Sequence, residues 1–440
     1  MKPKLQITMY KLQMRIGRMS STARNKKRFK LKKLKKKTKI RIYSIIALAL
    51  ALVISYCIVT FADMPTLSDK SIVTLLGVDL AGDEIEITAQ VIVPSSGAET
   101  QFNKEVVSAR GSNLLAALNS ISVTEGRKVE FGQCGLIVFG SEIVERGVLN
   151  EIKTLFSANT VSSGVLVVTT NDTASEFIAM AANLDEDTSE NLARLLNRLN
   201  TTTEMPMLCM LSFLNGEMGE SGSSFMPIVN LRQQDQSVQG EEAEAESEAE
   251  GGGGQNGGKD NPVGESDIAS LNTAIVTKNG VKVGELTQTE TQGLNFTLNE
   301  SKKGRYNIDE FTHSDKQFES LYGHIRRKSV RTRTSFVDGK PKIVYNIDVR
   351  IQLDEDVSLL GLNRQDRRAI DAVIRQNFEN KIKSEVESAI LKSKELDADF
   401  LNIKHRFFRT INRQMIQYDN GAGDFLSELE YEIKVKVNLN

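Results

Sequence analysis

Tryptophan is absent from the 440 residues of this chain, and cysteine and histidine occur only three times each. The three histidines, His313, His324 and His405, are isolated, and no cysteine stands at a spacing that would complete a metal-binding motif. Cys134 and Cys209 each lie in an apolar stretch, so we expect two buried thiols, with a disulfide in an oxidising compartment as the alternative. The sequence therefore predicts no metal site and no cofactor.

Signatures of common catalytic sites are also missing, since the sequence has no G-x-S-x-G, H-E-x-x-H or P-loop motif. Neighbouring acids that could form a catalytic pair occur at Glu142 with Glu145, and at Asp354, Glu355 and Asp356. The first two fall in the first turn of a predicted helix, where acids suit the helix dipole, and the others fall in a predicted turn. The sequence therefore predicts no catalytic residue.

Acidic residues do not occur before Asp63, whereas residues 1–41 contain 17 lysines and arginines. The rest of the chain holds 39 basic and 57 acidic residues, so a basic tail precedes an acidic body. This division predicts that the two parts lie on opposite sides of a membrane. We expect the tail, residues 1–41, to be cytoplasmic and to contact anionic lipid, at about 1 kcal/mol per lysine. Nonspecific nucleic-acid binding is the weaker interpretation, and no specific nucleic-acid partner is expected.

Residues 42–62 form a run of 21 uncharged residues, which as a helix would be roughly 32 Å long and could cross a bilayer once. Cys57, near its end, raises the alternative of a lipoprotein signal that is cleaved before a lipidated cysteine. Tyr56 is too large for the small residue that such a cleavage site needs before its cysteine. We therefore predict an uncleaved transmembrane helix, with the body of the chain outside the cytoplasm.

The first part of the body, residues 63–232, alternates strand and helix patterns, which predicts an α/β region. Two strands meet at Ala81-Gly82-Asp83, and the second carries apolar residues at every other position: Ile85, Ile87, Ala89, Val91 and Val93. Ser112 is the expected N-cap of a helix whose buried face holds Leu114, Leu115, Leu118 and Ile121. Residues 134–140 predict a central strand covered on both faces. Further helices are expected at 188–199 and 207–214, and a closing strand at 223–232.

Residues 233–266 are rich in glutamate and glycine, and this composition predicts a disordered linker with a reach of roughly 30 Å.

The second part, residues 267–440, opens with a hairpin turned at Asn279-Gly280, followed by a longer hairpin at Asp338-Gly339. A long helix is expected at 364–394, because apolar residues recur along it at helical spacing, and the last residues alternate as a strand. The prediction is an antiparallel sheet with a long helix across it.

Several of these segments together resemble the Ger(x)C proteins, the C subunits of spore germinant receptors. In the first part the resemblance is carried by Gly77-x-Asp79 after the first strand, the glycine-led helix at 111–118, the strand at 131–140 and the helix at 142–148. In the second part it is carried by residues 281–300, the long hairpin, the long helix and the segment 393–403. The chain departs from the family pattern at Gln133-Cys134 and at Ser157-Ala158-Asn159, and in lacking tryptophan and a lipidation signal.

The resemblance implies a non-enzymatic subunit at the bacterial cell membrane or the spore inner membrane. Its partners would be an integral membrane A-type subunit and a transporter-like B-type subunit, whose response to nutrients it would support. The implied fold is a set of α/β and α+β domains with mixed and antiparallel sheets flanked by helices, behind the single transmembrane helix. Two alternatives from other classes are a membrane-anchored module that binds a small ligand between the two parts and, with less support, a cell-wall-acting enzyme.

Overall fold

The structure, a computed structural model, describes residues 36–62, 70–94, 102–158, 160–183, 192, 196, 205–231, 268–270, 273–298, 303–309, 311–313, 316–318, 320–354, 364–421 and 423–439. The chain divides into two compact units, Met1–Pro65 and Thr66–Asn440. Residues 1–35 of the predicted tail, the predicted linker 233–266, and Glu355 with Asp356 lie outside the described residues. The same is true of the predicted helix at 188–199, apart from the buried Leu192 and Leu196.

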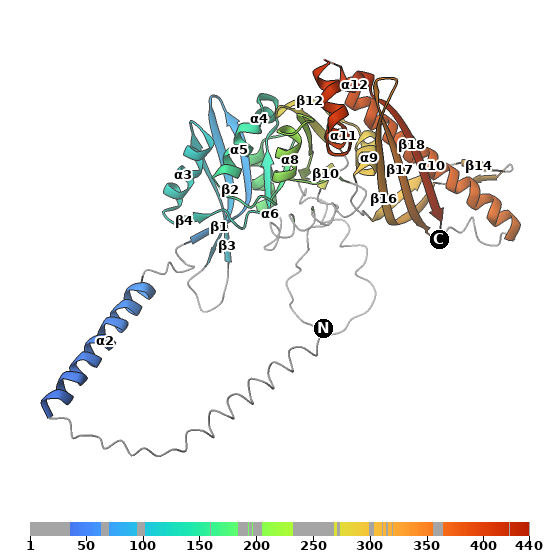
Figure 1. Cartoon of the computed structure of the whole chain (residues 1–440). Coiled ribbons are helices and arrows are strands. Elements are labelled where there is room, and N and C mark those ends of the chain that lie inside the picture. The colour runs from blue at the N-terminus through green and yellow to red at the C-terminus, as the bar shows by residue number, and fades with distance from the viewer. Residues whose placement is uncertain are drawn as a thin grey trace, which may run out of the picture. The chain divides into compact units, whose positions relative to one another are not determined.

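The described part of the first unit is a single helix, α2 (Lys36–Ala62) (Figure 1). It includes the whole of the uncharged run at 42–62, and the large apolar side chains described within it are exposed. Within the described part of the chain, no helix reaches the combination of length and hydropathy that crossing a membrane requires.

The first half of the second unit is built on a seven-stranded sheet with the order β3-β2-β1-β5-β6-β7, to which β4 adds by pairing with β1. The strands are β1 (Lys70–Ala81), β2 (Glu84–Pro94), β3 (Phe102–Gly111), β4 (Lys128–Glu130), β5 (Leu136–Phe139), β6 (Leu166–Thr169) and β7 (Leu208–Cys209). β1 pairs with β2 in antiparallel fashion and with β5 in parallel, so the sheet is mixed. The two predicted strands at Gly82 and the five alternating apolar residues of β2, all buried, are confirmed.

Helices cover both faces of this sheet. One face packs on α3 (Leu114–Glu125), α4 (Ser141–Arg146), α5 (Leu149–Ser157) and α8 (Met210–Glu217), and the other packs on α6 (Ala174–Asn183). Along β5 the buried side chains alternate between the two cores: Ile137 and Phe139 belong to the first, and Leu136 and Val138 to the second. The predicted central strand covered on both faces is therefore confirmed.

A three-stranded sheet joins the two predicted regions. β8 (Ser223–Pro227) precedes the linker, and it pairs with β11 (Ala274–Lys278), which follows the linker and forms a hairpin with β12 (Val281–Leu286). The linker itself starts and ends at paired strands, since β9 (Asn230–Leu231) pairs with β10 (Ile268–Ser270). The segment 223–232 forms strands as predicted, with Met226 and Ile228 in a core of the first region, and through β11 it also connects that region to the second.

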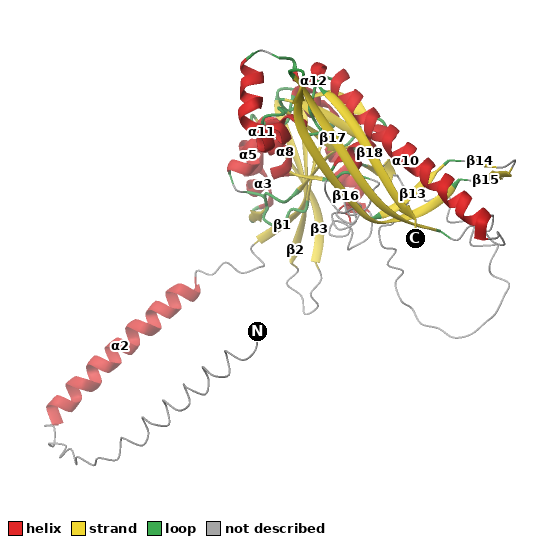
Figure 2. Cartoon of the chain, turned by 45° about the vertical axis from the view of Figure 1, so that its right-hand side comes forward, coloured by secondary structure: helices red, strands yellow, loops and turns green. Residues whose placement is uncertain are grey.

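The second half is a four-stranded sheet, β13 (Gly304–Ile308), β16 (Leu321–Val337), β17 (Lys340–Leu353) and β18 (Glu430–Leu439), in that order. Four helices pack on the core of this sheet: α9 (Gln288–Thr297), α10 (Arg364–Glu395), α11 (Ile403–Asn420) and α12 (Phe425–Glu428). β14 (Phe311–His313) and β15 (Lys316–Phe318) form a separate hairpin (Figure 2). The predicted long helix is confirmed to within one residue of its end. Both predicted hairpin turns are confirmed, with positive φ at Asn279, Gly280, Asp338 and Gly339.

Four predictions are corrected by the structure. The N-cap of α3 is Asn113, whose side chain accepts a hydrogen bond from the Ala116 N–H, and not Ser112. Leu115 is exposed, and Ala117 takes its place on the buried face. The segment 207–214 forms the short strand β7 before α8 begins at Met210. β18 runs parallel to β17, so the second sheet is mixed, because α10, α11 and α12 carry the chain back to the end at which β17 began.

Candidate functional site

Where the structure describes them, the residues weighed in the sequence as metal ligands or catalytic acids do not converge. Cys134 is buried and free, and burial raises its pKa to about 12, whereas Cys209 is also free and partly exposed. His324 lies 3.3 Å from Asp354 at the surface, and His405 is exposed on α11. Glu142 and Glu145 are exposed on α4. Among the described residues, no group of three potential metal-ligating side chains occurs.

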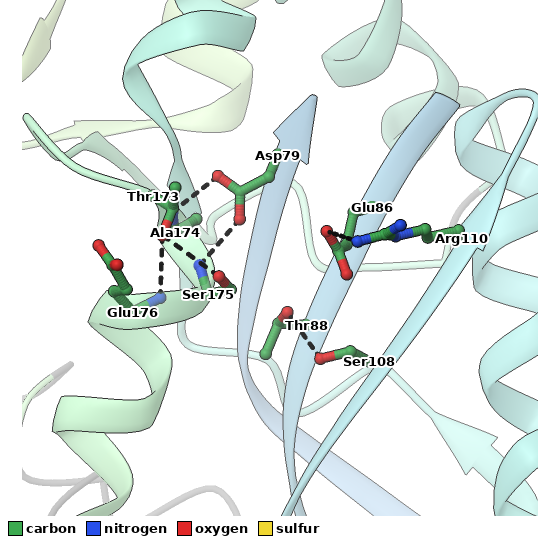
Figure 3. A network of polar contacts seen from close by, with 9 residues as sticks. All are labelled: Asp79, Glu86, Thr88, Ser108, Arg110, Thr173, Ala174, Ser175 and Glu176. Carbon is green, nitrogen blue, oxygen red and sulfur yellow. Dashed lines mark hydrogen bonds and ion pairs between the residues drawn. The ribbon is translucent and has the colours of Figure 1, made fainter. Parts of the chain in front are cut away.

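Asp79, the acid of the Gly-x-Asp motif, binds the start of a helix (Figure 3). Its Oδ1 accepts a hydrogen bond of 2.7 Å from the Ala174 N–H, and its Oδ2 accepts one of 2.8 Å from the Ser175 N–H, both in the first turn of α6. A carboxylate is favourable there because the helix dipole is positive at its N-terminus. Burial raises the pKa of Asp79, and the two hydrogen bonds oppose that shift.

Gly140, which follows β5, allows the backbone at the end of this strand to lie against the Asp79 carboxylate. A Cβ at this position would overlap the carboxylate of Asp79, so only glycine lets β5 end beside it. The motif therefore has a structural role: it fixes α6 against the end of β1. The sequence indicated the importance of Asp79 through its resemblance to the family, but it gave no sign of which helix the side chain contacts.

Two other buried carboxylates connect the segments before and after the linker. Glu217, at the end of α8, accepts hydrogen bonds from the Thr277 hydroxyl and, at 2.7 Å, from the Gly280 N–H in the β11–β12 hairpin. Asp399, before α11, accepts a hydrogen bond of 2.7 Å from the Ser221 hydroxyl. Each carboxylate is at most 4% exposed and cannot bind solvent water, so the hydrogen bonds from these donors replace those that water would make.

Asp399 also begins α11, since its two oxygens accept hydrogen bonds of 2.8 and 2.7 Å from the Ile403 and Lys404 N–H groups. Burial raises the pKa of Asp399 to about 6, although the Ser221 hydroxyl and the two N–H groups favour the charged form. Burial likewise raises the pKa of Glu217. Asp79, Glu217 and Asp399 therefore hold helices and turns in place through hydrogen bonds within the fold.

The outer face of the second sheet carries a concentration of positive charge. In register across β16, β17 and β18, this face presents exposed basic side chains that make no ion pair among the described residues, and we call them the basic sheet face: Arg327, Arg331, Arg333, Arg350 and Lys436. The apolar side chains between them, such as Tyr345 and Ile347, point to the buried face. In Figure 2, α10 and α11 do not lie over this face.

Two further lysines of the same face, Lys342 and Lys434, lie 3.6 and 2.8 Å from Glu432. Two acids of this face are exposed: Asp348 lies next to Lys436, and Glu430 is in register with Lys342. Surface arginines without partners are suited to contact with carboxylates or phosphates, which they can bind with two parallel hydrogen bonds. This surface was not predicted from the sequence, although Arg327, Arg331 and Arg333, which are separated by even numbers of residues in one strand, were its visible sign.

Comparison with known proteins gives two family matches. The model for the spore germination protein N-terminal domain matches residues 63–231, and the model described as spore germination B3/GerAC-like, C-terminal, matches residues 272–440. A solved structure titled "Crystal Structure of the GerBC protein" is 13% identical, with a TM-score of 0.49, and the match covers 83% of this chain and 96% of that chain. No curated protein matches the chain. Because the two models together cover most of the sequence, the chain belongs to the Ger(x)C family of spore germination proteins.

Proposed function

We propose that this chain is a membrane-anchored, extracytoplasmic and non-enzymatic subunit of a germinant-receptor complex, which supports nutrient-triggered germination through protein contacts. The observation that carries the proposal is the match of both halves of the body to the spore germination models. Asp79, Glu217 and Asp399 support a non-enzymatic role, because each accepts hydrogen bonds from groups within the fold. The partners proposed from the family are an integral membrane A-type subunit and a transporter-like B-type subunit.

The proposed anchor is the uncharged run at 42–62, with the basic tail on the cytoplasmic side in contact with anionic lipid. Two variants of the full chain separate this anchor from a lipid on Cys57. Leu50→Arg combined with Leu52→Arg places two charges in the run, and should release the chain from membranes washed in alkaline carbonate. Cys57→Ser should leave the chain in the membrane fraction. Release by Cys57→Ser alone would show that a lipid, not the helix, holds the chain.

The basic sheet face is the surface we propose for contact with an acidic region of a partner subunit. Charge reversal at Arg331→Glu and Arg333→Glu should prevent recovery of that partner, because it replaces attraction by repulsion across the interface. The matched control is Arg409→Glu with Arg413→Glu, which makes the same change of charge on the exposed side of α11.

The experiment is purification of the full chain, tagged at its C-terminus, from gently solubilised spore membranes, followed by mass spectrometry. Recovery of a polytopic transporter-like protein and an A-type subunit, lost in the sheet-face variant and retained in the α11 variant, is the expected result. Recovery of the unaltered chain alone, or together with wall-synthesis enzymes, would contradict the proposed function. Equal recovery with both charge variants would keep the receptor role and remove the sheet face from it.

A further inference from the structure

A groove enclosing about 710 Å³ lies between α9, β13 and α10, within the second half of the body. This volume is in the range of pockets that hold small molecules. Among the described residues that line the groove, the only apolar side chain is Ile308, which is itself 2% exposed and belongs to the core. An apolar ligand would therefore find little surface to bury, and the chemistry of the groove lies in its polar groups.

Primary amides dominate the lining, contributed by all three elements: Gln288 and Gln292 from α9, Asn307 from β13, and Asn377 and Asn380 from α10. An amide side chain offers two donors and one acceptor, so a cluster of them suits a ligand whose groups both donate and accept. The cluster is partly organised already. The Asn380 Oδ1 accepts a hydrogen bond of 2.9 Å from the Gln376 side chain, which leaves the Asn380 NH₂ group available to a ligand.

The ionisable groups of the groove balance one another. Lys381 lies 3.8 Å from Asp309, donates a hydrogen bond to the Asn307 Oδ1 at 3.4 Å, and stands over the ring of Tyr306. Glu385 is 3% exposed and accepts a hydrogen bond of 2.7 Å from the Tyr306 hydroxyl. Burial raises the pKa of Glu385 to about 7, so this carboxyl carries only part of a charge at neutral pH. The groove as a whole thus lacks a strong field of either sign.

The walls are held at a fixed separation where α9 crosses α10. A Cβ at Gly293 would collide with the backbone carbonyl of Glu385, so the two helices meet at the distance that only glycine allows. The Thr287 N-cap, which forms a capping box with Glu290, fixes the first turn of α9, where Gln288 and Thr289 line the groove. Preformed walls lower the entropic cost of binding a small ligand.

We propose that this groove binds a neutral, polyhydroxylated small molecule, a sugar or a polyol. Hydroxyl groups both donate and accept, as the amides, Thr289 and Ser384 of the lining do. A phosphorylated or strongly anionic ligand would meet Asp309 and Glu385, and a polyamine would meet Lys381. A free amino acid would have to separate Lys381 from Asp309 to satisfy its own two charges. The site lies inside the second half and not between the two parts of the body, and it does not depend on the proposed partners.

The test is calorimetric titration of the full chain, in a detergent without a sugar headgroup, with glucose, sorbitol, myo-inositol, a mixture of amino acids and inorganic phosphate. At least one of the three hydroxylated compounds should bind. Asn380→Ala and Gln292→Ala should each weaken that binding about 2- to 12-fold, the effect of one hydrogen bond. Asn150→Ala, an exposed amide on α5, is the matched control and should leave it unchanged.

Three outcomes would overturn the proposal. Binding of amino acids or phosphate in preference to the hydroxylated compounds would mean that the ligand class is wrong. Binding that both groove variants retain at full strength would place the ligand elsewhere on the chain. An absence of heat with all three compounds at millimolar concentration, while thermal unfolding shows the chain to be folded, would mean that the groove is not a site for this class.

Discussion

The strand pair β8–β11 exchanges side chains between the two halves of the body. Phe225, on β8 before the linker, is buried in the core of the second half, whereas Ile275, on β11 after the linker, is buried in the core of the first half. The two residues are close in the sheet, since Phe225 pairs with Val276 and Ile275 with Met226. Truncating Ile275 should therefore destabilise a core whose other members almost all come from residues 73–228.

Replacing Ile275, which is 3% exposed, with alanine should cost about 2–5 kcal/mol, the range for truncating a buried isoleucine in a packed core. If the variant destabilises the first half, the equilibrium constant for opening of β1, β5 and β6 rises by roughly 30-fold to several thousand-fold. Amide hydrogen exchange of the full chain, followed by peptide mass analysis, would show this as faster exchange in peptides from 70–81, 136–139 and 166–169.

Ile347→Ala is the matched control, because Ile347 is buried only in the core of the second half. It should accelerate exchange in β16 and β17 more than in β1 and β5. The reasoning is refuted if Ile275→Ala changes exchange only after residue 274, since the two halves would then be independent domains connected by a tether. An equal effect of both variants on every strand would instead show that the body opens as one unit.

Three further predictions concern the carboxylates and the linker. Asp79→Ala should lower the free energy of unfolding by about 2–4 kcal/mol, because two helix N–H groups lose their acceptor, and Asp79→Asn should lower it less. Equal urea midpoints for the wild type and both variants would contradict the capping role. Burial raises the pKa of Glu385 from 4.5 to about 7. Between these two pH values the folded state binds more protons than the unfolded state, so the chain loses stability as the pH rises from one value to the other. Glu385→Gln should therefore stabilise the chain by up to about 3 kcal/mol above neutral pH and little in mild acid, and a gain independent of pH in thermal unfolding would contradict this. Shortening the segment 232–267 to about eight residues should raise the free energy of unfolding by about 1 kcal/mol, because Leu231 and Ile268 stay paired and only the entropy of closing the loop changes. A lower free energy of unfolding would mean that the linker packs on the body.

The elements that the sequence predicted well are those whose signals are local. The period-2 pattern of β2, the turn residues Asn279-Gly280 and Asp338-Gly339, and the apolar stripe of α10 each specify a structure without help from distant segments. The stripe shows the limit of this reasoning, since it predicts which side of α10 is buried but not that α9 and β13 lie against it. For the same reason the groove between these three elements could not be predicted from the sequence.

The errors arose where two local signals compete or where a partner is distant in sequence. Ser112 and Asn113 are both good N-caps, and the structure uses Asn113 because Gly111 and Ser112 continue from β3 into the turn. The alternation in β18 predicts a strand but contains nothing about its direction relative to β17. Glu217 and Asp399 are single acids in ordinary sequence contexts, and only the fold shows that they are buried beside donors from the other half of the body.

The strand pairing also explains where the two family matches stop. The first ends at residue 231, the last residue of β9, and the second begins at residue 272, two residues after β10 ends. Leu231, at the end of the first matched segment, pairs with Ile268, four residues before the second begins. The acidic and glycine-rich residues between this pair therefore leave and re-enter the body at one place. A segment inserted in this way can change in length or charge without moving β8 away from β11, because the sheet fixes both of its ends. We infer that the linker is an insertion in a continuous body and not a hinge between two domains, so a ligand-induced change in the angle between the halves is not a mechanism that this fold favours.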